Sequence, residues 1–217
     1  MSAATPASQR SLAEHFVEVR QQEEARTIGM WVYLGTEILL FGGIFGAWAV
    51  YRYQHGEAWR EAAHHMDLWL GAINTAVLLL SSLTMALAVH AAHALQKKWT
   101  LLFVLATVSL GTLFLGIKAY EYMQEIHHGL APFAAPIPVR QAFTPATELY
   151  MNLYFAATGL HAFHLISAIA LLGGFILWIL KSGLSADRAA TLEILGLFWH
   201  LVDVVWIILY PMLYLTR

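Results

Sequence analysis

The chain has 217 residues, of which 59% are apolar and only 12% are charged, and its formal net charge is −2. Soluble domains usually carry about 25% charged residues, so lipid rather than water is the expected solvent for most of this chain. The small net charge provides no basic field for binding nucleic acid. The lack of cysteine excludes thiolate metal sites, iron–sulfur clusters and disulfide bonds.

Residues 1–25 are the only water-soluble stretch of any length, because they mix charged residues such as Arg10, Glu14 and Arg20 with a few apolar ones. A secretory signal needs a basic start, a short apolar run and a small-residue cleavage site. That combination is not found here, so we expect the first hydrophobic segment to remain in the mature protein.

Five apolar segments within residues 26–217 are long enough to cross about 30 Å of hydrocarbon as helices. We place these spans at residues 28–51, 68–95, 99–123, 150–180 and 191–215. The predicted fold is therefore an all-α integral membrane bundle of five transmembrane helices. Segment 52–67 is a polar connection and 96–98 is a tight turn. The long loop after the third span is expected to be extended, because it contains Pro132, Pro136, Pro138 and Pro145.

Basic residues near the helix ends predict the orientation of the bundle. The side of the N-terminus carries seven of them and the opposite side carries four. The seven are Arg10, Arg20, Arg26, Lys97, Lys98, Lys181 and Arg188, and the four are Arg52, Arg60, Arg140 and Arg217. Because basic residues stay in the cytoplasm, we expect the N-terminus inside and the C-terminus outside.

Small residues mark helix faces that allow a neighbouring helix to approach closely. They are Gly42, Gly43, Gly46 and Ala47 in the first span, Gly111 and Gly116 in the third, and Gly173 and Gly174 in the fourth. We expect these faces to take part in helix packing.

Ionisable residues inside the spans are the candidate functional groups, because a charge in the membrane is costly and usually faces protein or water. Glu37 lies within the first span among leucine and isoleucine residues. One interpretation is that it handles a proton or an ion. The other is that it is a carboxyl group bonded to a neighbouring helix.

The third span ends in a group of ionisable residues that includes Lys118, Glu121 and Glu125, followed by two histidines. Lys118 and Glu121 are three residues apart and therefore lie on one helix face, where they can pair. The favoured interpretation is a helix end whose charges are satisfied locally.

Two pairs of polar residues share helix faces in the last two spans. His161 and His164 are three residues apart, as helix-borne metal ligands often are. His200 and Asp203 have the same spacing, which suits a carboxylate that supports an imidazole. Structural hydrogen bonds between the fourth and fifth spans are the favoured interpretation, with haem or metal ligation as the alternative.

Motifs in all five spans resemble, in the same order, those of subunit III of the haem–copper terminal oxidases. Thr36 and Glu37 match the first shared helix, and the second span, NTAVLLLSSLTMALA, matches the family signature at Asn74, Thr75, Ser81 and Ser82. The remaining matches are Lys118, Glu121 and Tyr122, then Thr158, Gly159, His161 and His164, and finally Trp199, His200, Asp203 and Trp206. Leu201 stands where many members carry phenylalanine.

The resemblance implies an accessory subunit of an oxygen-reducing, proton-pumping respiratory complex in the inner (plasma) membrane of a bacterium. In this family haem and copper belong to the catalytic subunit I, so this chain is expected to hold no redox centre, no cofactor and no metal. Family members stabilise the catalytic subunit, sustain its proton uptake and bind phospholipid in a cleft between two helix groups.

The resemblance also assigns roles to residues. Buried proton-handling or structural roles are expected for Glu37, Lys118, Glu121, His161, His164, His200 and Asp203. Helix-packing roles are expected for Asn74, Ser81, Gly159, Trp199 and Trp206. Long family members have seven helices and this chain begins at what is their third, so its cleft is expected to involve helices of another subunit.

Three alternatives remain open from the sequence. The first alternative is within the family and concerns the type of complex. It is a cytochrome c oxidase, which Glu37 slightly favours, a bo-type quinol oxidase or a nitric-oxide-reductase-associated homologue. A membrane cytochrome b would use His90, His93, His161, His164 and His200 to bind haem across two helices. A small transporter would show inverted repeats and broken helices, and neither is evident in the sequence.

Overall fold

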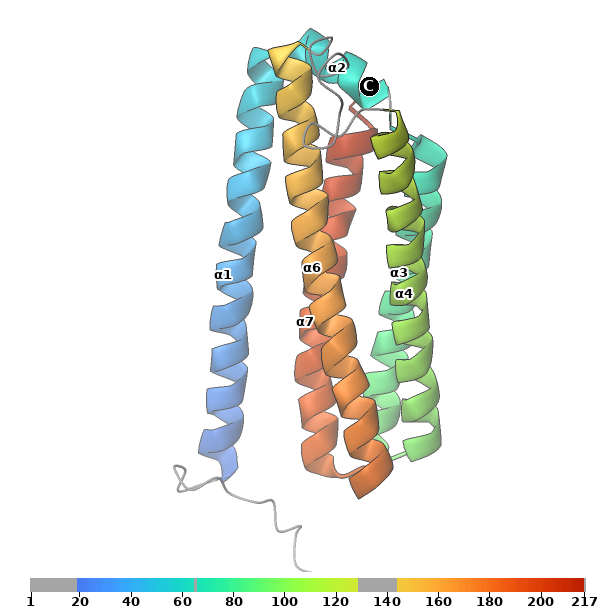
Figure 1. Ribbon diagram of the computed structural model, residues 1–217. Coiled ribbons are helices and arrows are strands. Elements are labelled where there is room, and N and C mark those ends of the chain that lie inside the picture. The colour runs from blue at the N-terminus through green and yellow to red at the C-terminus, as the bar shows by residue number, and fades with distance from the viewer. Residues whose placement is uncertain (1–18, 65, 129–143, 217) are drawn as a thin grey trace, which may run out of the picture.

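The computed structural model describes residues 19–64, 66–128 and 144–216, and within these ranges the chain is a bundle of α-helices without a strand (Figure 1). Five of the described helices are long and apolar enough to cross a membrane. They are α1 (Val19–Gln54), α3 (Leu68–His93), α4 (Lys97–His127), α6 (Pro145–Ser182) and α7 (Ala186–Tyr214). A short helix, α2 (Gly56–His64), follows α1. The all-α fold with five candidate spans is therefore confirmed.

The helix ends differ from the predicted ones by up to nine residues, the difference between the predicted start at residue 28 and Val19. The helix α7 begins at Ala186, five residues before the predicted start, and α1 begins at Val19, inside the segment expected to be water-soluble. The rest of that segment, residues 1–18, lies outside the described residues. The tight turn falls at residues 94–96 rather than 96–98, and Leu95 adopts a left-handed φ of 55° there.

Local side-chain chemistry fixes several of these ends. Asp67 caps α3 by accepting hydrogen bonds from the backbone N–H groups of Trp69 (2.9 Å) and Leu70 (3.1 Å). Thr144 caps α6, whose first residue is Pro145, as the fixed φ of proline permits at that position. The other three prolines of the predicted extended loop lie outside the described residues.

The carboxyl end of α6 is closed by glycine and arginine together. Gly183 follows the helix with a φ of 79°, a conformation that favours glycine. Arg188 then donates from Nη1 to the backbone carbonyl oxygens of Ser182 and Gly183, at 2.6 Å each. Both carbonyls lie where the last turn of a helix leaves its acceptors without intrahelical partners.

The polar connection 52–67 contains a helix that the sequence analysis did not predict. In α2, Trp59 and Ala63 are buried while Glu57, Arg60 and Glu61 are exposed. Trp59 packs edge-on against Trp48 of α1 and Tyr150 of α6, with ring centroids 6.0 and 5.2 Å apart. The apolar residues of this helix are one tryptophan and three alanines, a pattern too short to stand out among the charges.

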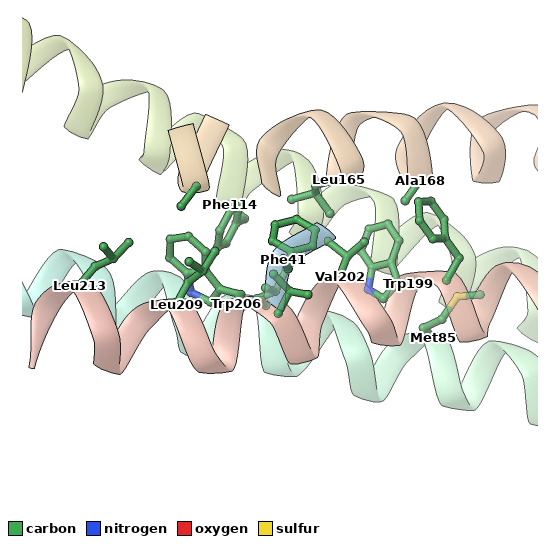
Figure 2. Packing of buried hydrophobic residues seen from close by; sticks show 14 of the residues in the cluster. Phe41, Met85, Phe114, Leu165, Ala168, Trp199, Val202, Trp206, Leu209 and Leu213 are labelled. Atoms are coloured by element: carbon green, nitrogen blue, oxygen red, sulfur yellow. The ribbon is translucent and has the colours of Figure 1, made fainter. Parts of the chain in front are cut away.

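The helices do not pack equally. Half of the most apolar stretch of α7 is buried, compared with 17% of that of α1. Figure 1 shows α1 at one side of the bundle, next to α6, while α3 and α4 run side by side on the other side. Figure 2 shows Trp199, Val202 and Trp206 of α7 among the buried side chains of the core.

Close helix contacts confirm only part of the small-residue prediction. A Cβ at Gly111 would stand 2.7 Å from the Trp199 ring, so α4 and α7 approach as closely as a glycine allows. By contrast, a Cβ at Gly42, Gly43 or Gly46 would meet no atom within 4 Å in the described chain. The glycine face of α1 thus packs against none of the other described helices.

The basic residues on which the orientation prediction rests lie at the two ends of the bundle. Arg26, Lys97, Lys98, Lys181 and Arg188 lie at the end where α1 begins, and Arg52 and Arg60 lie at the other end.

Candidate functional site

The largest group of buried polar side chains in the described residues joins three helices near the end of α4. We call it the lysine cluster, and it consists of Lys118, Glu121 and Glu125 of α4, Tyr154 of α6 and Tyr214 of α7. Each of the five side chains is buried, since none of these residues is more than 5% exposed.

The predicted pairing of Lys118 with Glu121 is confirmed, with Nζ 2.9 Å from Oε2. The ammonium group also donates to the hydroxyl oxygens of Tyr154 (2.8 Å) and Tyr214 (2.6 Å). Tyr214 donates in turn to Oε1 of Glu121 at 2.5 Å. Charge-assisted hydrogen bonds of this kind are stronger than neutral ones, so the ion pair ties α4 to α6 and α7 rather than only to itself.

Aromatic rings surround the ammonium group of Lys118. Its Nζ lies 4.7 Å from the ring centroid of Tyr154 and 5.3 Å from those of Tyr214 and Trp206. Cations are attracted to aromatic faces at such distances, more strongly when water is excluded. The lysine is therefore held inside the bundle and does not extend to the membrane surface.

A second contact between α4 and α6 lies next to the lysine cluster. The hydroxyl groups of Tyr122 and Thr158 are hydrogen-bonded to each other, and Thr158 also donates to the Tyr154 carbonyl oxygen at 2.6 Å. The Tyr122 hydroxyl is 4.0 Å from where a Cβ at Gly159 would stand. A methyl group would make an ordinary contact there, so close packing does not by itself require this glycine.

Glu37 bonds to a neighbouring helix. Its Oε2 lies 2.8 Å from Nε2 of His164 in α6, and the Nδ1 of His164 is 2.8 Å from the Leu160 carbonyl oxygen. Both side chains are largely buried, with exposed fractions of 12% and 9%. This contact joins α1 to the rest of the bundle.

Among the described residues, the histidines and Asp203 do not form the expected hydrogen bonds between α6 and α7, so this prediction was wrong. His164 bonds to α1, and Nδ1 of His200 lies 2.8 Å from the Ser82 hydroxyl of α3. Shared-face spacing was correctly recognised, but spacing along one helix does not determine which neighbour that face meets. His164 therefore connects α6 to α1, and His200 connects α7 to α3.

Three predicted site residues are buried without a hydrogen-bond partner among the described residues. They are Asn74 of α3, His161 of α6 and Asp203 of α7. His161 lies between aromatic rings, with its ring centroid 5.0 Å from Trp206 and 5.5 Å from Phe114. The Ser82 hydroxyl that bonds His200 lies close to the Asp203 carboxyl group.

The two predicted packing tryptophans join α7 to α3. Trp199 donates from Nε1 to the Ser81 hydroxyl at 3.2 Å, and Trp206 donates to the Thr75 hydroxyl at 3.0 Å. The Trp206 ring also packs edge-on against Phe114 of α4, with centroids 4.8 Å apart. Both indole N–H groups are thus satisfied inside the bundle, as buried tryptophans usually are.

Sequence reasoning missed the two tyrosines of the lysine cluster. Tyr154 and Tyr214 are separated from Lys118 by 36 and 96 residues. Their only signal was a tyrosine inside or at the end of an apolar span, which also fits an interfacial anchor. Only the packing of α6 and α7 against α4 brings them to the ammonium group.

The described residues contain no group of three or more histidine, cysteine, aspartate or glutamate side chains arranged to hold a metal ion. Haem ligation across two helices requires imidazoles that face each other. Both ring nitrogens of His164 already contact protein oxygens, and Nδ1 of His200 contacts Ser82. The geometry therefore gives the cytochrome b alternative no support.

Fold and site together define an integral membrane protein whose buried ionisable groups bond mainly to one another. A sequence model of the family described as "Cytochrome c oxidase subunit III" matches residues 11–216. The chain belongs to this family.

Curated relatives agree on the subunit but carry different oxidase names. The chain is 30% identical to "Cytochrome c oxidase subunit 3" of Thermostichus vulcanus, over 91% of this chain and 90% of the relative. It is 29% identical to "Cytochrome bo(3) ubiquinol oxidase subunit 3" of Pseudomonas aeruginosa, over 86% and 83%. It is 28% identical to "Probable quinol oxidase subunit 3" of Staphylococcus saprophyticus, over 87% of each chain.

Proposed function

We propose that this chain is the accessory subunit III of a respiratory cytochrome c oxidase, which stabilises the catalytic subunit I and supports its proton uptake. In this proposal the partner subunit holds the haem and copper that reduce oxygen, and this chain provides the rigid membrane surface beside it. The complex lies in a bacterial plasma membrane, with the N-terminus of this chain in the cytoplasm.

The observation that carries the proposal is that buried polar side chains are engaged in hydrogen bonds with one another. Lys118, Glu121 and both tyrosines of the lysine cluster bond to one another, and Glu37 bonds to His164. Side chains engaged in this way hold helices together, which suits a scaffold better than a site of chemistry. Membership of the subunit III family supports the same conclusion.

Lipid binding is supported by a groove between the beginnings of α1 and α7 and the end of α3. The groove has a volume of about 560 Å³, and its lining includes apolar side chains such as Trp31 and Leu197. Arg26 and the His93–Glu193 pair, with side chains 3.3 Å apart, add polar groups to it. An acyl chain along the apolar wall with its phosphate near Arg26 would match this lining.

The choice of cytochrome c rather than quinol as electron donor depends on other subunits, and Glu37 is the one residue of this chain that favours it. We expect a tagged form of this chain, purified in mild detergent, to bring down a large subunit whose spectrum shows haem. Oxygen consumption by this complex should be supported by reduced cytochrome c. Consumption with quinol alone would replace the proposal by the quinol oxidase alternative.

The stabilising role has its own test. A strain that lacks this chain is expected to assemble a catalytic subunit that starts at normal activity and loses it progressively during turnover. Steady activity over many turnovers without the chain would overturn the role in stability. A Soret band in the chain purified alone would instead support the cytochrome b alternative.

A further inference from the structure

Glu125 is the carboxyl group of the lysine cluster that does not form the ion pair with Lys118. The cluster contains one ammonium group and two carboxyl groups, and Lys118 pairs directly with only one of them, Glu121. Glu125 is only 5% exposed. Solvation by water therefore does not compensate for the lack of a cation bonded to its carboxyl group.

All three N–H donors of the Lys118 ammonium group are already engaged. They reach Glu121 Oε2 at 2.9 Å, the Tyr154 hydroxyl at 2.8 Å and the Tyr214 hydroxyl at 2.6 Å. An ammonium group has three donors and no more. Glu125 therefore receives no N–H donor from this lysine.

The two oxygens of Glu125 have different surroundings. Oε1 accepts a hydrogen bond from the Tyr154 hydroxyl at 2.7 Å. Oε2 is buried and has no hydrogen-bond partner in the described part of the chain. The titratable groups near it are Lys118, Glu121 and Tyr122 of its own helix, Tyr154 of α6 and Tyr214 of α7.

These contacts describe a carboxyl group that carries a proton. An ionised Glu125 would be a second negative charge beside Glu121 with one hydrogen bond to compensate it, and buried charges without a partner are strongly unfavourable. A proton on Oε2 makes the cluster neutral, while Oε1 remains the acceptor for Tyr154. We propose that Glu125 is a proton-binding site, which takes up and releases its proton at the aqueous face where α4 ends.

The position of Glu125 provides a short route to water. It lies two residues before the end of α4 at His127, or about 3 Å along the helix axis. His127 and His128, which follow, are exposed. The reaction is only the making and breaking of the O–H bond at Oε2, with the proton coming from water and returning to it.

This inference goes beyond the proposed function, in which the chain supports proton uptake by a partner. It rests on contacts within this chain and does not depend on which oxidase the chain belongs to. The site lies at the end of the bundle opposite the groove and the start of α1 (Figure 1).

Infrared spectroscopy of the purified complex tests the site, because a protonated carboxyl group has a C=O stretching band that a carboxylate lacks. The wild type minus Glu125→Gln difference is expected to contain this band at an intensity of one carboxyl group per chain. The band should shift to lower frequency in D2O as the proton exchanges. Absence of the band overturns the proposal, and a band that does not shift in D2O overturns exchange with water.

Two further variants sharpen the test. Lys118→Met removes the cation from both carboxyl groups, so the intensity is expected to double as Glu121 also takes up a proton. Tyr154→Phe removes the hydrogen bond to Oε1 and should raise the frequency of the band without loss of intensity. If Glu125→Gln does not assemble, the Tyr154→Phe shift decides, and an unchanged spectrum overturns the proposal.

The matched control is Glu57→Gln on α2. Glu57 is exposed and lies outside the lysine cluster, so its replacement should leave the band of Glu125 unchanged. A loss of the same band in this variant would assign it to a group outside the lysine cluster and overturn the proposal.

Discussion

The four helices α3, α4, α6 and α7 and the helix α1 belong to one bundle but are held in different ways. Between the four helices, indole, hydroxyl and ammonium donors are satisfied from one helix to the next, as in the lysine cluster. The helix α1 reaches its neighbours through the Glu37–His164 bond and a few aromatic contacts, such as that of Tyr33 with Phe198. Interhelical hydrogen bonds and close packing drive helix association in lipid, so we expect substitutions to be costly within the four helices and mild at α1.

The largest effect is expected for Lys118→Met in the lysine cluster. Removing one member of a buried ion pair costs about 3–5 kcal/mol, because the remaining polar group is buried without its partner. We expect the variant complex to lose this subunit at a lower temperature during thermal melting in detergent. Lys97→Met is the control, since Lys97 is exposed at the other end of α4. Equal melting of the two variants would contradict the role of the ion pair.

A smaller loss is expected from overpacking the contact between α4 and α7. In Gly111→Leu the new side chain would enter the space of the Trp199 ring, which stands 2.7 Å from the Cβ position. Overpacked cores lose about 1–3 kcal/mol. The matched control is Gly116→Leu on the same helix, where a Cβ meets no atom within 4 Å among the described residues. The two variants should differ clearly in melting temperature, and similar values would show that this contact is not tight.

The next effect is expected at the bond between α7 and α3. His200→Ala leaves the Ser82 hydroxyl without its 2.8 Å partner, and interhelical hydrogen bonds in membranes are worth about 0.6 to 2 kcal/mol. A double-mutant cycle with Ser82→Ala measures the coupling between the two residues. Additive losses in the cycle would mean that the bond itself contributes nothing.

The smallest effect is expected at α1. Glu37→Gln keeps a side chain of similar size that still bonds to His164, so the subunit should remain in the purified complex and melt above His200→Ala. Quantitative gel analysis of the purified complex and a melting curve in detergent check both statements. Loss of the subunit from the complex, or equal melting of the two variants, would contradict the contrast between α1 and the four helices.

The spans were predictable from the sequence because an apolar segment that must satisfy its backbone in lipid has little alternative to a helix. The Lys118–Glu121 pair was predictable for a related reason, since three residues along a helix fix a shared face. The direction of that face was not predictable. These helices are apolar nearly all round, so nothing in the sequence indicated that His164 meets α1 or that His200 meets α3.

Long-range partners were the other limit of the sequence. Tyr214 reaches Lys118 only because α7 ends beside the last turns of α4. The helix α2 was missed because it is short and its apolar residues are one tryptophan and three alanines. Both the Lys118–Tyr214 bond and the packing of Trp59 against α1 and α6 join separate segments of the chain. Residue spacing within one segment does not predict such contacts.

Arg188 has a consequence for experiments on membrane topology. It is one of the basic residues that predict the cytoplasmic side, and its guanidinium group also holds the carbonyl oxygens of Ser182 and Gly183. Neutralising it would therefore remove one of the charges on which the predicted orientation rests and, in the same step, loosen the end of α6. Lys97, Lys98 and Lys181 are exposed at the same end of the bundle. At these positions charge can be removed to test the predicted orientation without breaking the two hydrogen bonds of Arg188.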